Sequence, residues 1–314
     1  FLGFSTAAAT LAACETPVVK SVPYLVKPDE IIPGVANYYA TTIYDGRDYA
    51  SVLVKTREGR PIKIENNKDC TNARMQASVL SLYDSSRLKN PLKNQKPNEW
   101  KEIDSEIKQK LNQISNKEGK IVLLTSTIIS PTTRKIITEF SKKYGNTEHI
   151  MLDSVPYDAI LNANNNDFGV RALPRYYFDK AKVIVSFGAD FLANWGDNSY
   201  ATDYVNGRNP KSGKMSKHYQ IETNLSLTGS NADMRIQIKP SEQKYLLSNL
   251  YRSLDGSKSD ARLSKIVKHL KSSKGSSIVV SDITDEKLQR IVNAINHKLG
   301  NYSNTIDITK PSYL

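Results

Sequence analysis

Short apolar runs alternate with helix-like patterns along most of the chain. Residues 120–129 (KIVLLTSTII) are expected to form a buried strand, residues 181–190 (AKVIVSFGAD) a continuous apolar strand, and residues 276–282 (SSIVVSD) a further strand. Residues 218–224 (HYQIETN) form a weaker strand candidate. Because strand-like runs alternate with segments of helical spacing, the pattern predicts βαβ units with parallel sheets.

The helical segments carry start and stop signals. A helix from Trp100 is expected to begin at an Asn98 cap and to turn one apolar face inward, made of Trp100, Ile103, Ile107, Leu111 and Ile114. Ser130 followed by Pro131 predicts the start of the next helix. Its expected buried stripe consists of Ile136, Ile137, Phe140 and Tyr144.

Three further helices are predicted toward the C-terminus. Residues 241–254 have Ser241 as the expected cap, and residues 284–300 end on Gly300, where a C-terminal glycine belongs. Between them lies a helix over 262–272, with its inward residues at Leu263, Ile266, Val267 and Leu270. The fold class that follows is α/β, with parallel sheets and flanking helices.

The first hundred residues follow a different pattern. Four prolines between Pro17 and Pro33 predict an extended arm, because proline lacks an amide donor and restricts φ. Apolar runs at 52–56 and 61–65 flank Glu58-Gly59, which predicts a β-hairpin. Four segments result: an export-signal segment at 1–14, the arm at 15–38, a small β region at 39–95 and α/β domains at 96–314.

The opening stretch FLGFSTAAATLAAC resembles the apolar part of an export signal. Leu11 to Cys14 also resembles a bacterial lipoprotein box, which makes Cys14 a lipidation candidate; the alternative is an unmodified core cysteine. The charged region of a signal is absent, so the sequence is expected to start inside a longer precursor. The loop at 66–72 is expected to be shortened or interrupted. Intact mass of the mature N-terminus separates the two interpretations of Cys14.

Composition narrows the function classes only partly. The 314 residues are 39% hydrophobic and 24% charged, with a net charge of +12. Such a charge is compatible with nucleic acid, an anionic membrane or an acidic protein. The lysines, however, alternate with acidic residues and lack interleaved aromatic platforms. We therefore interpret the positive charge as a solvated basic surface and expect no nucleic-acid partner.

No catalytic constellation emerges from the motifs. In α/β folds ligands bind beyond the carboxyl ends of strands, which places Gly188, Ala189 and Asp190 at the edge of any pocket, although a lone glycine there is usually a tight turn. Ser186 lacks a recognisable base, and Trp195 is expected to pack. The histidines are expected on the surface or on helix faces, without metal partners; they are His149, His218, His269 and His297.

Several segments in order resemble the molybdopterin oxidoreductase superfamily. SVLVKTREGRPIKIENN resembles its N-terminal hairpin, VIVSFGADFL its second-domain strand and turn, and SNADMRIQIKPSEQ its "ADxWLPIRPGTD" segment. The resemblance places the four cysteine ligands of the family's iron–sulfur cluster at Ile43, Gly46, Ala50 and Asn72. None of these is a thiolate, the ligand that such clusters require. ETN at 222–224 replaces a "DPR" stretch that helps to hold the pterin, so neither cofactor is expected here, and no catalytic, cofactor or metal residue is assigned.

The departures themselves resemble the molybdopterin-enzyme-like, iron–sulfur-containing component of bacterial alternative complex III, on the strength of segments such as YYATTIYDGRDYASVLVKTREGRPIKIE and ETNLSLTGSNADMRI. That family joins a molybdopterin-enzyme-like half without molybdenum to an iron–sulfur half, behind a twin-arginine (Tat) export signal. The resemblance implies a non-catalytic scaffold on the periplasmic side of the bacterial inner membrane. The iron–sulfur clusters would lie in a C-terminal half outside this sequence.

The partners that this resemblance implies belong to a respiratory electron-transport complex. They are integral-membrane quinol-binding subunits, multihaem cytochrome c subunits and the iron–sulfur half, with a terminal oxidase as an additional acceptor. Two alternatives stay open: an active bis-pterin molybdenum reductase subunit, and an exported protein that binds a small ligand near Gly188.

Overall fold

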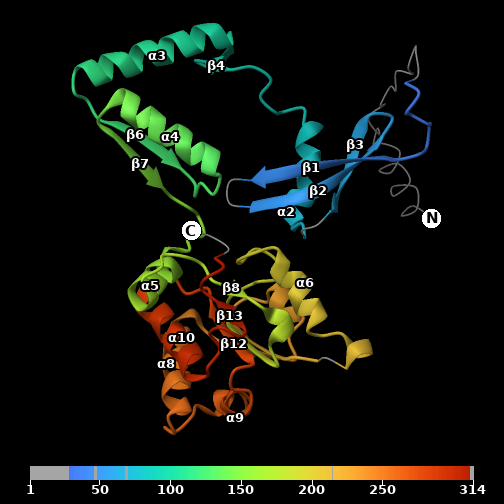
Figure 1. Ribbon diagram of the computed structural model, residues 1–314, viewed down its shortest axis with the longest axis vertical. Helices are drawn as coiled ribbons and strands as arrows, with labels where there is room; N and C mark the ends of the chain where they lie inside the picture. Colours follow the sequence, from blue (N-terminus) through green and yellow to red (C-terminus); the bar gives the residue numbers. More distant parts are fainter. Residues whose placement is uncertain (1–27, 46–47, 68–69, 214, 312–314) are drawn as a thin grey trace, which may run out of the picture.

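The computed structural model describes residues 28–45, 48–67, 70–213 and 215–311, arranged as two lobes (Figure 1). The export-signal segment 1–14, Cys14 and most of the arm 15–38 lie outside the described residues. One lobe combines a small β-sheet with a helix–strand unit, and the other is built on a parallel sheet. The expected α/β class, with parallel sheets, flanking helices and a small N-terminal β-sheet, is confirmed.

The N-terminal sheet is an antiparallel meander of β1 (Asn37–Asp45), β2 (Asp48–Arg57) and β3 (Arg60–Asn66). The predicted hairpin is present, with Glu58 and Gly59 as its two-residue turn at φ +45° and +74°. Two positive φ values in a two-residue loop match the twist of the strands that they connect. Helix α2 (Ala73–Ala77) and the 3₁₀ turn η1 (Ser78–Leu82) then pack Met75 and Val79 on Ala50, Val52 and Ile64.

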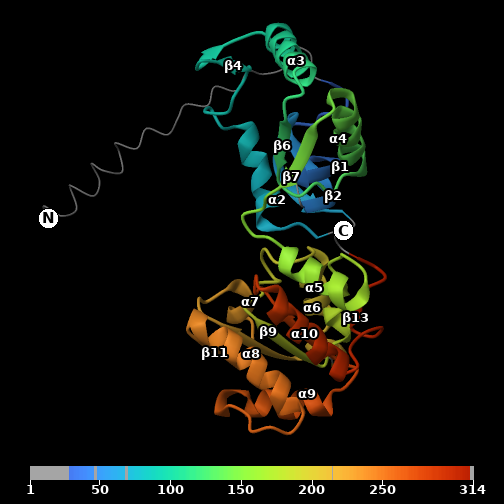
Figure 2. The ribbon, with the colours of Figure 1, turned by 90° about the vertical axis from the view of Figure 1, so that its left-hand side faces the viewer.

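A helix–strand unit follows the short hairpin of β4 (Leu92–Lys93) and β5 (Lys96–Pro97). It consists of α3 (Trp100–Asn116), β6 (Ile121–Thr125), α4 (Pro131–Tyr144) and β7 (Thr147–Met151). The two strands pair in parallel, as a βαβ connection requires. Figure 2 shows α4 alongside the two strands and α3 at the end of the molecule farthest from the second lobe.

This unit departs from the predicted burial. The strand expected to be buried at 120–129 exposes Val122 and Leu124, and helix α3 buries none of its residues. Ile136, expected in the inward stripe of α4, is 59% exposed. The reason is that α4 covers one face of a sheet with only two strands, so periodicity alone overestimates burial here. Capping also differs: the N-cap of α3 is Glu99, not Asn98, whereas Ser130 caps α4 as predicted through a 3.3 Å bond from Thr133 N.

The second lobe is a doubly wound domain around four parallel strands in the order β11-β10-β9-β12. The strands are β9 (Val183–Phe187), β10 (Lys217–Glu222), β11 (Met234–Gln237) and β12 (Ser277–Ser281). Every residue of β9 and β12 is buried. The continuous apolar runs of the sequence therefore became two-sided buried strands, as the pattern predicted.

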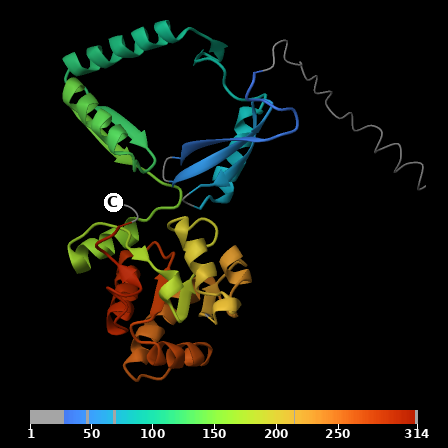
Figure 3. The same ribbon diagram turned by 45° about the vertical axis from the view of Figure 1, so that its right-hand side comes forward.

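Helices cover both faces of this sheet (Figure 3). One face packs on α8 (Pro240–Leu254), α9 (Ser264–Ser272) and α10 (Glu286–Lys298). The other packs on α5 (Asp158–Phe168) and α6 (Ser199–Asn206), and a small pair of β8 (Arg175–Tyr176) with β13 (Ile306–Asp307) closes the edge. The four inward residues predicted around α9 are all buried. Shorter elements complete the domain: η2 (Phe178–Lys180), η3 (Pro210–Ser212), α7 (Leu227–Ser230) and η4 (Ala261–Leu263).

Two helix ends test the sequence signals directly. Gly300 follows the end of α10 with φ +69°, as predicted for a C-terminal glycine. The Ser241 cap is wrong, because α8 begins earlier than expected, with Lys239 as N-cap and Pro240 as its first residue. Glu242, in the first turn of α8, accepts a 2.8 Å hydrogen bond from the Lys239 amide. This is the glutamate bond of a capping box, and it caps the helix in place of the bond expected from Ser241.

Candidate functional site

The carboxyl ends of β9 and β12 form the position where a doubly wound sheet binds ligands. The chain leaves β9 toward the α6 face and leaves β12 toward the α10 face, so the strand order reverses between these two neighbours. Such a reversal opens a crevice at the end of the sheet. Gly188 follows β9 at this point and Asp282 follows β12, and the Asp282 amide donates to the Phe187 carbonyl at 3.1 Å.

Side chains from the start of α8 and from the end of β12 meet in front of this turn. The Gln243 amide donates to the Phe187 carbonyl at 3.3 Å and to the Asp282 carboxylate at 3.1 Å. A Cβ at Gly188 would lie 2.2 Å from Asp282 Oδ1, so glycine is needed for contact as well as for its φ of +76°. Burial raises the pKa of Asp282, and the negative charge of Glu222 raises it further. The hydrogen bond from Gln243 acts in the opposite direction but does not outweigh them.

The tight fit at Gly188 leads to a prediction with a matched control. Gly188→Ala should cost about 2–3 kcal/mol of unfolding free energy, since it combines an unfavourable φ with the Asp282 contact. Gly169→Ala, at φ +71° with open space around it, should cost only about 1 kcal/mol. Urea denaturation of both variants measures the difference. Equal losses would show that the Asp282 contact is relieved without cost.

Glu222 closes the end of β10 in the same way. Its carboxylate is 4% exposed and accepts from Ser226 N (3.2 Å), Ser226 Oγ (2.6 Å), Gln220 Nε2 (3.1 Å) and Arg235 Nε (2.6 Å). Burial by itself raises the pKa of Glu222, but the hydrogen bonds from Ser226, Arg235 and Gln220 outweigh it and the pKa is lowered. Its acceptor positions are occupied by the protein, so Glu222 acts as an internal brace.

A buried polar row leads from the domain interior to Glu222. His218, Gln220 and Glu222 alternate along β10, and His218 Nε2 lies 3.3 Å from Gln220 Oε1. Tyr204 Oη lies 3.0 Å from His218 Nδ1 and donates to the Asn231 carbonyl at 2.9 Å. The expectation of surface or helix-face histidines is thus wrong for His218, which is fully buried on a strand. His149 also lies on a strand, β7, whereas His269 and His297 lie on helices as expected.

The remaining residues singled out from the sequence have structural contacts. Ser186 is fully buried and its hydroxyl donates to the Ala189 carbonyl at 2.9 Å. Asp190 accepts from the Thr228 amide (2.9 Å) and hydroxyl (2.7 Å), which ties the β9 turn to α7. Trp195 is 5% exposed and packs in an aromatic cluster, as predicted. No base lies in hydrogen-bond contact with Ser186 among the described residues, so a nucleophilic site is not formed here.

The positions that correspond to cluster ligands meet where the two lobes join. Ile43 faces Ala50 across the β1–β2 ladder, and Ala50 is fully buried in the small core. Asn72 caps α2 by accepting from Met75 N at 2.9 Å, and it donates to Asp48 (2.9 Å) and to Asn198 of the second lobe (3.1 Å). Gly46 lies outside the described residues.

Two more contacts reinforce this junction. Arg74 forms an ion pair with the buried Asp48, and the Cys70 thiol contacts the Thr202 hydroxyl. Side chains of both lobes line a small cavity of about 30 Å³ beside them. At the position of the fourth expected cluster ligand, Asn72 donates to Asp48, which also pairs with Arg74. The sequence pointed to Asn72 but missed Asp48 and Asn198, because nothing in their local pattern indicates an interlobe contact.

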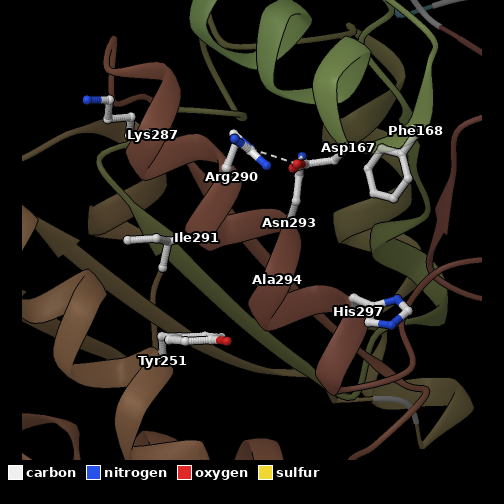
Figure 4. Close-up of a pocket in the computed structure, with 9 residues that line it drawn as sticks. All are labelled: Asp167, Phe168, Tyr251, Lys287, Arg290, Ile291, Asn293, Ala294 and His297. Carbon is white, nitrogen blue, oxygen red and sulfur yellow. Dashed lines mark hydrogen bonds and ion pairs between the residues drawn. The ribbon is translucent and has the colours of Figure 1, made fainter.

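A separate groove of about 700 Å³ crosses helix α10 on the second lobe (Figure 4). Its lining comes from α5, α8 and α10, and the sequence contained no signal for it. Among the described residues, no group of three or more His, Cys, Asp or Glu side chains is arranged to hold a metal ion. The helices that the structure describes also include none with the length and apolar character needed to cross a bilayer.

Comparisons with known proteins support the fold alone. No protein-family model and no curated protein matches the chain. Acetylene hydratase from Pelobacter acetylenicus is similar in structure, with a TM-score of 0.51, 12% identity, and coverage of 86% of this chain and 42% of that one. The formyltransferase/hydrolase complex from Methylorubrum extorquens, solved with methylofuran, gives a TM-score of 0.47, 11% identity and coverage of 63% and 54%.

The chain therefore spans about half or less of the length of these structures. The similarity to acetylene hydratase supports a distant molybdopterin-type fold, as the sequence resemblance indicated. Among the described residues, the carboxylates of Glu222 and Asp282 lie at the ends of β10 and β12, and Ile43, Ala50 and Asn72 carry no thiolate.

Proposed function

We propose that this chain is a non-catalytic scaffold portion of a membrane-associated respiratory complex that oxidises quinol, of the alternative complex III type. The observation that supports the proposal is the set of side chains at the two places where the sequence resemblance expects cofactors. Glu222, Asp282 and Gln243 close the crevice at the sheet, and Asn72 bonds to Asp48 and Asn198 at the lobe junction. A molybdopterin-type fold in which side chains replace the cofactors retains its surface for binding partners.

The proposed partners are integral-membrane quinol-binding subunits, multihaem cytochrome c subunits and an iron–sulfur half of the same polypeptide. A terminal oxidase is a further electron acceptor in this arrangement. The proposed location is the periplasmic side of the bacterial inner membrane. The net charge of +12 supports electrostatic steering toward acidic faces of such partners. In this role the two lobes act as one support, joined through the contacts of Asn72 with Asn198 and of Cys70 with Thr202.

The experiment is gentle detergent extraction of the native complex, followed by subunit identification and analysis of molybdenum, tungsten and pterin. We expect the chain to co-purify with haem-containing and membrane-embedded subunits, with only substoichiometric molybdenum, tungsten and pterin fluorescence. Iron in the complex is compatible with the proposal, because the clusters belong to another part of it. Stoichiometric molybdenum or tungsten with pterin would instead establish an active enzyme, and isolation of a soluble monomer would overturn the scaffold role.

A further inference from the structure

The groove over α10 has walls from two other helices. Figure 4 shows α10 crossing it, with Asp167 and Phe168 of α5 on one side and Tyr251 of α8 on the other. The α10 positions that face it have helical spacing and follow one stripe, made of Lys287, Arg290, Ile291, Ala294 and His297. The middle of this stripe, Ile291 and Ala294, is apolar. Lys287 and Arg290 lie toward one end of it, and His297 lies at the other.

The aromatic walls of the groove are held in place. Phe168 packs against Tyr302 with ring centroids 4.9 Å apart. The Lys298 ammonium lies 4.2 Å from the centroid of the Tyr251 ring and pairs with Asp255 at 2.5 Å. Rings that are fixed by neighbours present flat apolar surfaces without losing further conformational entropy when a ligand binds.

The charges of the groove leave a positive surplus. The Asp167 carboxylate accepts from Arg290 Nε at 2.7 Å and from Asn293 Nδ2 at 2.9 Å, so the acidic group is satisfied internally. Within the part of the chain that the structure describes, Lys287 has no ion-pair partner and the His297 ring has no hydrogen bond. These two side chains lie ten residues apart on one helix, or roughly 15 Å at 1.5 Å per residue.

We propose that this groove binds a flat aromatic anion, with its ring over Ile291 and Ala294 and its anionic group at Lys287. The volume of about 700 Å³ falls within the usual range of small-molecule sites, roughly 300–1,000 Å³. Its nine lining residues are far fewer than the roughly 20–30 per side of a stable protein interface, which favours a small ligand over a docked helix. The site is formed by α5, α8 and α10, its lining includes neither Gly188 nor Asp282, and the inference is independent of the scaffold role.

The test uses 1-anilinonaphthalene-8-sulfonate as the probe, in fluorescence titrations of the whole chain. Lys287→Glu should weaken binding about tenfold, because it replaces attraction to the sulfonate by repulsion. Ala294→Trp should abolish saturable binding by filling the floor of the groove. Lys108→Glu makes the same charge change on exposed α3 of the other lobe and should leave the affinity unchanged.

A second control addresses the apolar strand face of the other lobe. Leu124→Asp changes the exposed residue of β6 and should leave the saturable phase intact. Loss of that phase in Leu124→Asp would place the probe on β6 and overturn the groove proposal. Equal weakening by Lys287→Glu and Lys108→Glu would also overturn it, since only overall charge would then matter. Circular dichroism melts show whether each variant is folded. If Ala294→Trp is not folded, the comparison of Lys287→Glu with Lys108→Glu tests the proposal.

Discussion

Replacing Glu222 by alanine should lower the free energy of unfolding of the second lobe by about 3–5 kcal/mol, the range found when one member of a buried ion pair is removed. The loss is large because four donors converge on this carboxylate and it is 4% exposed. Alanine removes the ion-pair partner of the largely shielded Arg235 guanidinium, which keeps only its 3.4 Å hydrogen bond to the Thr223 carbonyl. The measurement is the urea midpoint of the second lobe, with an unchanged m-value as evidence that the folded state is retained.

The control for this prediction is Glu242→Ala. Glu242 also pairs with an arginine, Arg262, at 2.9 Å, but both side chains of that pair are about one-third exposed. Its loss should shift the midpoint less, although it also removes the capping bond from the Lys239 amide, because water reaches the groups that are left without their partner. Similar shifts for the two variants would mean that the bonds around Glu222 add little beyond an ordinary surface pair, and the view of Glu222 as an internal brace would be abandoned.

The second large effect is a dependence of stability on pH that comes from His218. Burial lowers the pKa of this imidazole to about 4, from an ordinary value of 6.5, against a hydrogen bond with Gln220 that favours the charged form. Between these two values the unfolded chain binds a proton that the folded chain excludes. Stability therefore falls as pH decreases from 6.5 to 4, by about 1.4 kcal/mol per unit at most and about 3 kcal/mol in total.

His218→Phe separates this contribution from the other groups. Phenylalanine has a ring of similar size and does not titrate, while Tyr204 keeps its hydrogen bond to the Asn231 carbonyl. Burial raises the pKa of Asp233, but hydrogen bonds from Arg208 and the His218 amide outweigh it and hold that pKa at about 2, so this carboxylate titrates mostly below the window. Denaturation curves at several pH values should show a flatter profile for the variant between pH 4 and 6.5. Parallel profiles would show that His218 does not carry the slope.

The turn after β9 keeps its glycine geometry while the Asp282 side chain lies in front of it. At the end of β9 the backbone still makes the glycine turn that leads away from a parallel strand. The space in front of it contains Asp282, held by Gln243 from the start of α8.

The junction between the lobes follows the same principle. Asn72 occupies the position of the fourth expected cluster ligand, and its side chain bonds to Asp48 and to Asn198. Hydrogen bonds among neutral and charged groups can hold two lobes together without a cluster, provided that each buried partner is satisfied. The Arg74–Asp48 pair meets that condition for the buried carboxylate.

Local sequence was sufficient wherever the physics is local. The strands at β9 and β12, the hairpin turn at Glu58-Gly59, the Ser130 cap and Gly300 after α10 all follow from chain-neighbour interactions: apolar period, preferred φ and first-turn hydrogen bonds. The sequence also shows directly that Ile43, Gly46, Ala50 and Asn72 cannot supply thiolates, because a ligand's chemistry depends on residue type alone. The α/β class follows from the order of these elements.

Only the tertiary structure decided which surfaces are covered and which side chains meet. Asn98 and Ser241 are good caps by type, yet the helices beside them begin at other residues. His218 looked like a surface histidine because its burial depends on α6, whose Tyr204 packs against it from another part of the chain. Other features also depend on segments far apart in sequence. They are the exposure of Leu124, the contact of Asp282 with Gly188 and the groove over α10. The sequence pattern does not specify the distances between such segments.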